Sequence, residues 1–245
     1  MKTRGLNVLV TGGGSGIGLA IARRLMVDNT VVVAGRDKAK LAAVVRDDPS
    51  LRARVLDVTD EDQARETVDS VARELGGLSL LVNSAGTIAG SSFADPDGVG
   101  LAERDVQTNL MGSVRMTRLA LPHLRRAEDG AVVFLSSVVA IAPAPGFAVY
   151  SATKAAVHSL ARSLRRELAG QVRVFDVLPT WVDTDLARNL EVSKLAPAAV
   201  AESLLRAMAR DRYEVLVGQA GVVALVDRLS PGLGEALVAR ATRPA

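Results

Sequence analysis

A phenol and an amine stand four positions apart in the segment YSATK, as Tyr150 and Lys154. The segment that follows, AAVHSLARSLRREL, has helical periodicity, so the two side chains are expected to share one helix face. A phenol with a pKa of about 10 exchanges protons poorly at neutral pH, but a neighbouring ammonium favours the phenolate and lowers that pKa. The pair thus suggests a proton-transfer site for a carbinol or carbonyl oxygen, although the spacing alone is more typical of a surface helix.

Two further polar residues strengthen the catalytic interpretation. Ser137 ends an apolar run 13 residues before Tyr150, and ligands of parallel sheets bind where the strands end. Its hydroxyl is expected to hold the substrate oxygen beside the phenol. Asn109 falls within a helix expected to start near Leu101, where it is either a solvated polar group or the anchor of a water that passes protons to Lys154.

A glycine-rich turn, TGGGSGIG, follows the first apolar run and precedes the helical segment LAIARRL. A strand, a tight turn and a helix N-terminus make an anion site, because free amides and the helix dipole point at a bound phosphate. The spacing is GxxxGxG, on Gly12, Gly16 and Gly18, and the GxGxxG spacing is not met. The predicted phosphate-binding residues are Gly12, Gly14, Ser15, Gly16, Ile17 and Gly18.

Folds in which such a glycine turn follows the first strand bind dinucleotides, and the end of the second apolar run indicates whether the dinucleotide carries a 2′-phosphate. Arg36 stands where folds of this kind hold the adenosine ribose, and an arginine suits a 2′-phosphate. Asp37 is expected to cap the next helix, DKAKLAAVV; turned inward, it would favour the unphosphorylated cofactor instead. For Asp57 two interpretations stay open, an acceptor for the adenine amino group and a cap for the helix near Asp60.

The elements that must position these residues alternate between short β-branched runs and longer segments of helical period. Nearly continuous apolar runs indicate strands covered on both faces, and the intervening segments are long enough for crossover helices. We therefore predict one doubly wound parallel α/β sheet with helices on both faces, in a single domain over residues 1–245. The seven predicted strands are 7–11, 30–35, 52–58, 78–83, 131–136, 172–178 and 214–218. The stretch after Gly218 carries no recognisable chemistry.

Composition excludes several other classes. Lys plus Arg exceeds Asp plus Glu by only 30 − 27 = 3, with both signs scattered, so nucleic acid is a poor partner. The chain has no cysteine, and its two histidines, 35 positions apart, form no metal-binding pattern, so no metal is expected. The apolar runs are broken by glycine, serine and proline, so we expect a cytoplasmic protein without a membrane segment.

Taken together, TGGGSGIG, LDV, NSAG, Asn109, Ser137, YSATK and PTWVDT resemble the short-chain dehydrogenase/reductase family, in the right order and intervals along the whole chain. The resemblance implies a Rossmann-type fold in which Ser137 orients the carbonyl, Tyr150 is the acid and base, Lys154 binds the nicotinamide ribose, and Asn109 supports a proton relay. It also implies NADP(H) rather than NAD(H), and a homo-oligomer, dimer or tetramer, formed through helices 101–127 and 150–169. The cofactor contacts that it adds are Asp57 and Val58 at adenine, Asn83, Ala85 and Gly86 at the central strand end, and Pro179, Val182 and Thr184 toward the nicotinamide.

Two positions depart from the family pattern. Ser84 replaces the second asparagine of NNAG, and Thr180 replaces the glycine after Pro179, which adds bulk beside the nicotinamide. Thr180, Phe147 and Trp181 are candidate substrate contacts with Ser137, and the two aromatic residues imply a partly apolar substrate. The predicted activity is the NADP(H)-dependent interconversion of a carbonyl and a secondary alcohol. The alternative is a dinucleotide-binding sensor or scaffold with little turnover.

Overall fold

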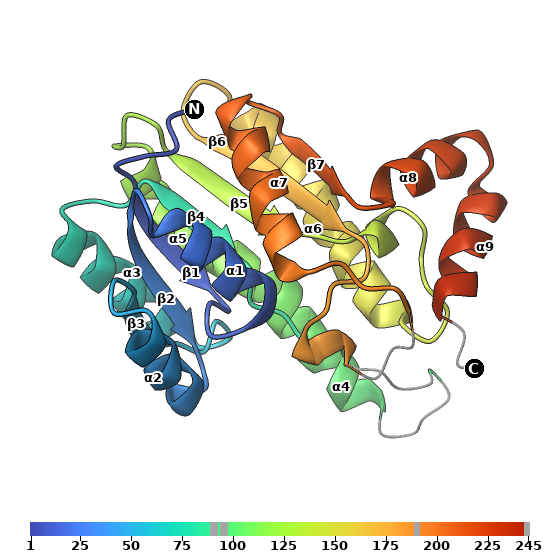
Figure 1. Cartoon of the computed structure of the whole chain (residues 1–245), viewed down its shortest axis with the longest axis horizontal. Helices are drawn as coiled ribbons and strands as arrows, with labels where there is room; N and C mark the ends of the chain where they lie inside the picture. The colour runs from blue at the N-terminus through green and yellow to red at the C-terminus, as the bar shows by residue number, and fades with distance from the viewer. Residues whose placement is uncertain (89–92, 94–97, 189–191, 243–245) are drawn as a thin grey trace.

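The computed structural model describes residues 1–88, 93, 98–188 and 192–242. Seven strands form one parallel sheet in the order β3-β2-β1-β4-β5-β6-β7 (Figure 1). The chain builds outward from β1 to β3, crosses to β4 and continues to β7, which confirms the predicted doubly wound sheet. The strands are β1 (Asn7–Thr11), β2 (Thr30–Gly35), β3 (Arg52–Val55), β4 (Leu80–Asn83), β5 (Ala131–Leu135), β6 (Arg173–Pro179) and β7 (Glu214–Val217).

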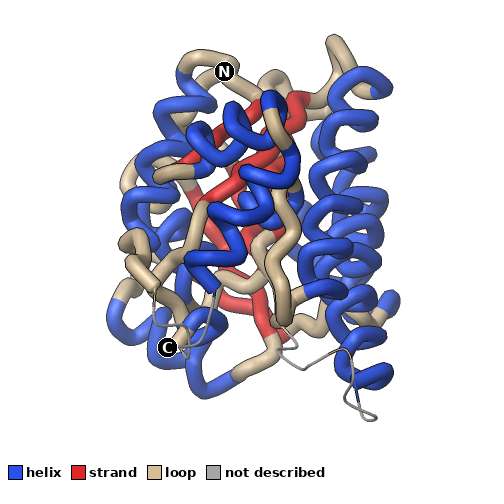
Figure 2. Tube along the Cα trace, turned by 90° about the vertical axis from the view of Figure 1, so that its right-hand side faces the viewer, coloured by secondary structure: helices blue, strands red, loops and turns tan. Residues whose placement is uncertain are grey.

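Helices cover both faces of the sheet, as predicted, and Figure 2 shows the strands running between two groups of helices. Two apolar cores account for this arrangement, because alternate residues of each strand face opposite sides. One core joins the sheet to α1, α2 and α7, and the other joins it to α3, α5 and α6. The helices are α1 (Gly16–Leu25), α2 (Lys38–Asp47), α3 (Glu61–Leu75), α4 (Gly98–Asp105), α5 (Gly112–Leu124), α6 (Ala148–Glu167), α7 (Pro197–Ala209), α8 (Ala220–Leu229) and α9 (Pro231–Thr242).

The helix expected from Leu101 begins at Gly98 and is not uniform. Between α4 and α5 the backbone widens into the π-helical segment Val106–Met111, which contains Asn109. Such widened turns are rare and frequently mark functional positions. The irregularity turns the Asn109 side chain into the interior, where the residue is 1% exposed.

The C-terminal helices form a third apolar cluster with the chain around Tyr150. Ala220 and Val223 of α8 and Val238 of α9 pack with the short 3₁₀ turn Val138–Ala140. Phe147, Tyr150 and Trp181 lie against this cluster. The stretch after Gly218, from which we expected no chemistry, therefore supplies a wall next to the predicted catalytic residues. Among the described residues, no helix has the length and apolar character that a membrane crossing requires.

Candidate active site

A groove runs along the carboxyl edge of the sheet over the switch point between β1 and β4. It consists of two adjoining cavities that share Gly12, Ser15, Gly86 and Leu186. We call them the Tyr150 half, lined also by Ser137, Lys154 and Trp181, and the Arg36 half, lined also by Lys40, Val58 and Thr108. Open parallel sheets bind ligands at the point where the strand order reverses, so a ligand is expected in this groove.

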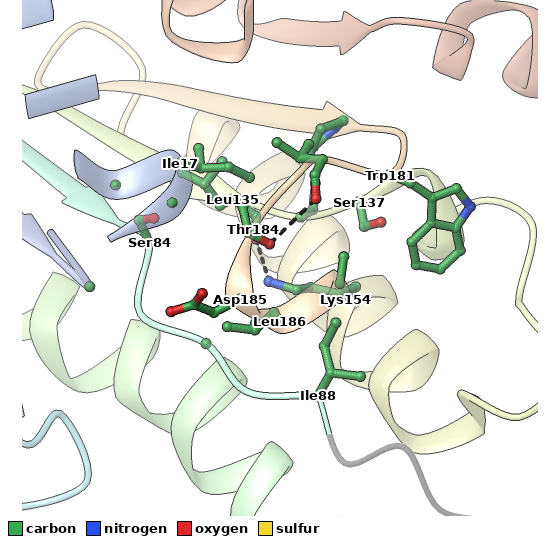
Figure 3. A pocket seen from close by; sticks show the side chains of 18 of the residues that line it. Ile17, Ser84, Ile88, Leu135, Ser137, Lys154, Trp181, Thr184, Asp185 and Leu186 are labelled. Atoms are coloured by element: carbon green, nitrogen blue, oxygen red, sulfur yellow. Dashed lines mark hydrogen bonds between the residues drawn. The ribbon is translucent and has the colours of Figure 1, made fainter. Parts of the chain in front are cut away.

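Tyr150 and Lys154 lie in the first turns of α6 and face the same cavity. Lys154 is 7% exposed, and its Nζ lies 5.6 Å from the centroid of the Tyr150 ring. The same Nζ donates a 2.7 Å hydrogen bond to the carbonyl oxygen of Leu135 at the end of β5 (Figure 3). This hydrogen bond holds the amine at one position in the cavity.

The pKa of Tyr150 moves in the direction opposite to our expectation. Burial and the negative charge of Asp105 raise the pKa of the phenol well above its ordinary value, and a hydrogen bond with Ser137 only partly opposes them. Burial likewise lowers the pKa of Lys154 to about 8, against the charges of Asp176 and Asp105. The prediction that the ammonium lowers the pKa of Tyr150 was wrong because it ignored the loss of solvent around both groups.

Ser137 and Asn109 approach the pair from different elements. Ser137 is buried just beyond β5, and its Oγ accepts a 3.4 Å hydrogen bond from the Val139 amide. Asn109 is tied to the chain after β4, since its Oδ1 accepts from the Thr87 amide at 2.8 Å and its Nδ2 donates to the Thr87 carbonyl at 3.0 Å. Nδ2 also lies 3.2 Å from Thr153 Oγ1 on α6. Asn109 is therefore not a solvated polar group; its side chain joins the segment at Thr87 to α6.

Close backbone packing shapes the glycine turn. A Cβ added at Gly12 would lie 2.8 Å from the backbone of Ala85, and one at Gly18 would lie 2.4 Å from the Gly12 carbonyl oxygen. Gly12 and Gly16 also have positive φ angles, 65° and 56°. Ser15 is the N-cap of α1, but its side chain makes no capping hydrogen bond. The first amides of α1 thus face the groove without a side-chain cap, the arrangement that binds anions.

In the Arg36 half, the two aspartates near Arg36 are both engaged locally. Asp37 caps α2, as expected, by accepting a 3.0 Å hydrogen bond from the Lys40 amide. Asp57 accepts from the amide and the hydroxyl of Thr59, at 2.9 and 2.8 Å, and its other oxygen lies 4.0 Å from the guanidinium of Arg36. Asp60, and not Asp57, caps α3. This removes the capping interpretation of Asp57 and leaves Arg36 and Lys40 as the cations of this half.

The other predicted cofactor contacts lie along the groove or directly under it. Asn83 is 4% exposed below the groove and donates a 3.0 Å hydrogen bond to Thr117 Oγ1. The methyl group of Thr184 lies 3.0 Å from the position that a Cβ atom would occupy if Gly16 had one. Val58 and Ala85 line the Arg36 half, Gly86 lines both halves, and Gly12, Ser15, Gly16, Ile17, Gly18, Pro179, Val182 and Thr184 line the Tyr150 half.

The three candidate substrate residues other than Ser137 do not lie alike in the cavity. Trp181 lines the cavity and packs on Phe147, with ring centroids 5.9 Å apart and planes inclined by 50°. Phe147 contacts the third apolar cluster and supports Trp181 from behind. Thr180 also lines the cavity, but its Oγ1 would lie 2.7 Å from a Cβ at Gly218, so the hydroxyl is directed toward the end of β7.

Sequence reasoning missed two buried aspartates. Asp105 is fully buried and accepts a 2.6 Å hydrogen bond from Thr87 Oγ1; its place one helical turn before Asn109 was a usable signal. Asp176 of β6 is also fully buried and lies 2.5 Å from Nδ1 of His158 on α6. No spacing links Asp176 to α6, since it comes from a different part of the chain. Within the described ranges, no group of three or more His, Asp or Glu side chains has a metal-binding arrangement.

A seven-stranded parallel sheet with a glycine turn at its switch point and a Ser-Tyr-Lys set beside it defines an α/β oxidoreductase. The family model described as "short chain dehydrogenase" matches residues 6–195, and the chain belongs to this family. An uncharacterized oxidoreductase of Bacillus subtilis strain 168, DltE, is 34% identical over 189 residues, 76% of this chain and 75% of the relative. An uncharacterized oxidoreductase of Staphylococcus aureus strain USA300 is 32% identical over 212 residues, 84% of this chain and 91% of the relative.

Solved structures agree with this assignment. A short chain dehydrogenase from Burkholderia cenocepacia J2315, crystallised in complex with NADP, has a TM-score of 0.87 at 26% identity, covering 97% of this chain and 99% of that one. A short-chain dehydrogenase from Streptomyces avermitilis has a TM-score of 0.83 at 27% identity, covering 94% of each chain. A short chain dehydrogenase/reductase from Burkholderia phymatum in complex with NAD shares the fold, with a TM-score of 0.85 at 23% identity over 100% of this chain and 99% of that one.

Proposed function

We propose that the protein is an NADP(H)-dependent oxidoreductase that interconverts a carbonyl and a secondary alcohol, with Tyr150 as general acid and base. The observation that carries this proposal is the convergence of Ser137, Tyr150 and Lys154 in one cavity, which continues into the groove over the glycine turn. A phenol, a hydroxyl and a buried amine at one end of a groove lined by the glycine turn support proton transfer to an oxygen next to a hydride acceptor.

The described residues fit a dinucleotide. The close approach of Gly12 and Gly18 to neighbouring backbone, and the uncapped start of α1, suit a pyrophosphate. Thr108 lines the Arg36 half, and its buried Oγ1 has no hydrogen-bond partner among the described residues, so a ligand in the groove would satisfy it. Arg36 and Val58 would then hold the adenosine end, and Lys154 the nicotinamide ribose.

Preference for the 2′-phosphate rests on the charges of the Arg36 half. Arg36, Asp37 and Lys40 all line it, but the Asp37 carboxylate accepts the capping hydrogen bond from the Lys40 amide, and Lys40 Nζ is paired with Asp185. The Arg36 guanidinium is therefore the group that would attract a phosphate dianion. The Burkholderia cenocepacia relative crystallised with NADP adds support by similarity.

In the proposed reaction, the nicotinamide, when bound, carries the hydride. Ser137 donates a hydrogen bond to the substrate oxygen, and Tyr150 gives that oxygen its proton during reduction. Because burial raises the pKa of Tyr150, the phenol keeps its proton at neutral pH, which favours reduction there and oxidation at alkaline pH. Asn109 acts as the anchor of a relay that returns a proton toward Lys154. Trp181, backed by Phe147, gives the substrate an apolar contact, and Thr180 borders it.

We further propose that residues 1–245 form one domain that works in the cytoplasm as a homo-oligomer, a dimer or tetramer joined through helices 101–127 and 150–169. Its partners would be a small carbonyl or alcohol substrate and the cofactor, with neither nucleic acid nor membrane. The near balance of charges and their scattered distribution support the exclusion of nucleic acid.

Turnover with NADPH and NADH against a panel of apolar ketones and aldehydes tests the activity. Oxidation of NADPH with at least one carbonyl is expected, and it should be slower with NADH. Binding of NADP(H) without turnover on any ketone, aldehyde or alcohol would favour the sensor or scaffold alternative. Tighter calorimetric binding of NAD than of NADP would contradict the cofactor assignment.

A further inference from the structure

A chain of three polar side chains lies behind the catalytic residues. Ser136 Oγ donates a short hydrogen bond to one oxygen of Asp176, and His158 Nδ1 lies 2.5 Å from the other. Ser136 Oγ also lies 3.3 Å from the Val177 carbonyl oxygen. Asp176 has no exposed surface, whereas the His158 side chain is 15% exposed, so the chain of contacts runs from the protein interior toward solvent.

The arrangement is not a nucleophilic triad. Ser136 contacts the carboxylate and not the imidazole, so its hydroxyl has no base to activate it. A buried carboxylate also adds little to the free energy of unfolding, because a well-packed apolar side chain is commonly as stabilising as a buried ion pair. These observations point to a role for Asp176 in the neighbouring site.

Asp176 joins both elements that hold Lys154. Leu135, whose carbonyl accepts the 2.7 Å hydrogen bond from Lys154, immediately precedes Ser136, and Ser137 follows it. The contact of Ser136 with Asp176 thus fixes the peptides on either side. On the other element, His158 lies one helical turn after Lys154 in α6. The negative charge of Asp176 also reaches the amine, since it opposes the effect of burial on the pKa of Lys154.

We propose that Asp176, held by Ser136 and His158, is a positioning residue that fixes the charged amine of Lys154. The proposal rests on the proposed function insofar as Lys154 serves catalysis. The carboxylate is held at a fixed place between β5 and α6, from which its negative charge favours the protonated amine of Lys154.

Other charged groups lie around Asp176 and His158 and stay unchanged in the test. Arg162 follows one turn after His158 on α6, and Glu214 of β7 is the register partner of Asp176. Asp105, at the end of α4, acts on Tyr150 and Lys154 from the opposite element. The neighbouring strand β5 places apolar Phe134 beside Asp176, and the 3₁₀ turn Val138–Ala140 is apolar.

The test follows Lys154 directly by NMR, in cofactor-free protein isotopically labelled at the lysine Cε. The chain has five lysines, so the signal is assigned by its loss in Lys154→Arg. In Asp176→Asn the midpoint of the Lys154 titration is expected to fall by about half a pH unit or more. An unchanged midpoint in this variant would overturn the proposal.

His158→Asn provides the second arm and decides alone if Asp176→Asn does not fold. The variant loses the 2.5 Å contact that holds Asp176 on the side of α6, so the midpoint of the Lys154 titration should move away from the wild-type value, whereas the control His123→Asn should leave it unchanged. An unchanged midpoint in His158→Asn would refute the role of His158 in holding Asp176.

This readout needs no turnover, so it separates failure of the positioning role from failure of the proposed reaction. For any carbonyl that is reduced, the pH profile of kcat/KM should shift in Asp176→Asn and His158→Asn in the same direction as the Lys154 signal. A profile that keeps its shape while only kcat falls would indicate a merely structural role.

Discussion

The two halves of the groove are built in different ways. In the Tyr150 half, Lys154 is 7% exposed and its neighbours Asn109 and Asp105 are buried, each held by named hydrogen bonds. In the Arg36 half, the side chains of Arg36 and Lys40 are 48% and 49% exposed, and backbone amides form the rest of the anion site. Buried polar groups couple strongly to one another, whereas exposed charges are screened. Substitutions should therefore act on chemistry and stability in the first half and on cofactor choice in the second.

Tyr150→Phe should show the largest effect. Loss of the phenol oxygen removes the proton donor, so kcat is expected to fall by about 10²- to 10⁴-fold. Cofactor affinity should change little, because the ring remains in the third apolar cluster. The chain has only two tyrosines, and Tyr213→Phe, whose ring packs 5.3 Å from Phe175, is the matched control. A fully active Tyr150→Phe variant would show that the proton donor is misassigned.

Lys154→Met should alter how stability depends on pH. Lys154 has a pKa of about 8 in the folded chain against 10.5 for an ordinary lysine, so above pH 8 the unfolded chain binds more protons. The free energy of unfolding should therefore rise between pH 8 and 10, by up to about 3 kcal/mol at roughly 1.4 kcal/mol per pH unit. Above about pH 10 the raised pKa of Tyr150 acts in the opposite direction, because the unfolded phenol then loses its proton first.

Urea unfolding of the cofactor-free protein at several pH values measures this. In Lys154→Met the rise should disappear, and at pH 7 the variant should be more stable by about 1 to 2 kcal/mol after loss of the hydrogen bond to Leu135. The exposed Lys38→Met is the control and should keep the wild-type profile. Identical profiles for all three proteins would mean that Lys154 titrates like a solvated lysine.

Arg36→Ala tests the Arg36 half. Removal of one charge-assisted contact should weaken NADP(H) binding by about tenfold to a hundredfold and leave NAD(H) binding nearly unchanged. Calorimetric titration with both cofactors measures the difference, with Arg46→Ala, an exposed arginine later in α2, as the control. An equal loss for both cofactors would assign Arg36 to the shared part of the dinucleotide.

Asp185→Asn should have the smallest effect, although its contacts look prominent. Asp185 accepts a 2.7 Å hydrogen bond from Lys40, and a second from Arg188, beside the groove. Hydrogen bonds from Lys40 and Arg188 hold the pKa of Asp185 below its ordinary value, but both sides of this ion pair are exposed, and exposed pairs contribute little. Cofactor affinity should stay within about threefold of the wild type by calorimetry. A tenfold change would reveal that this pair shapes the groove.

The parts of the site that the sequence predicts are those encoded by local spacing. The glycine turn, Tyr150 with Lys154, and the cap at Asp37 each lie within one short segment, and their geometry follows from the strand or helix around them. Asp176 could not be linked to Lys154 in advance, because packing of β6 against α6 creates their proximity. The pKa of Tyr150 was mispredicted for the same reason: burial is a property of the assembled layers and not of helical spacing.

The third apolar cluster joins two parts of the chain that lie far apart in sequence. The family match ends at residue 195, whereas α8 starts at Ala220, and both C-terminal helices pack with the segment that carries Phe147, Tyr150 and Trp181. The wall beside Tyr150 thus comes from chain beyond the matched residues. Because α8 and α9 supply this wall and α6 supplies Tyr150 and Lys154, substitutions in the two C-terminal helices can reshape the cavity without replacing either residue.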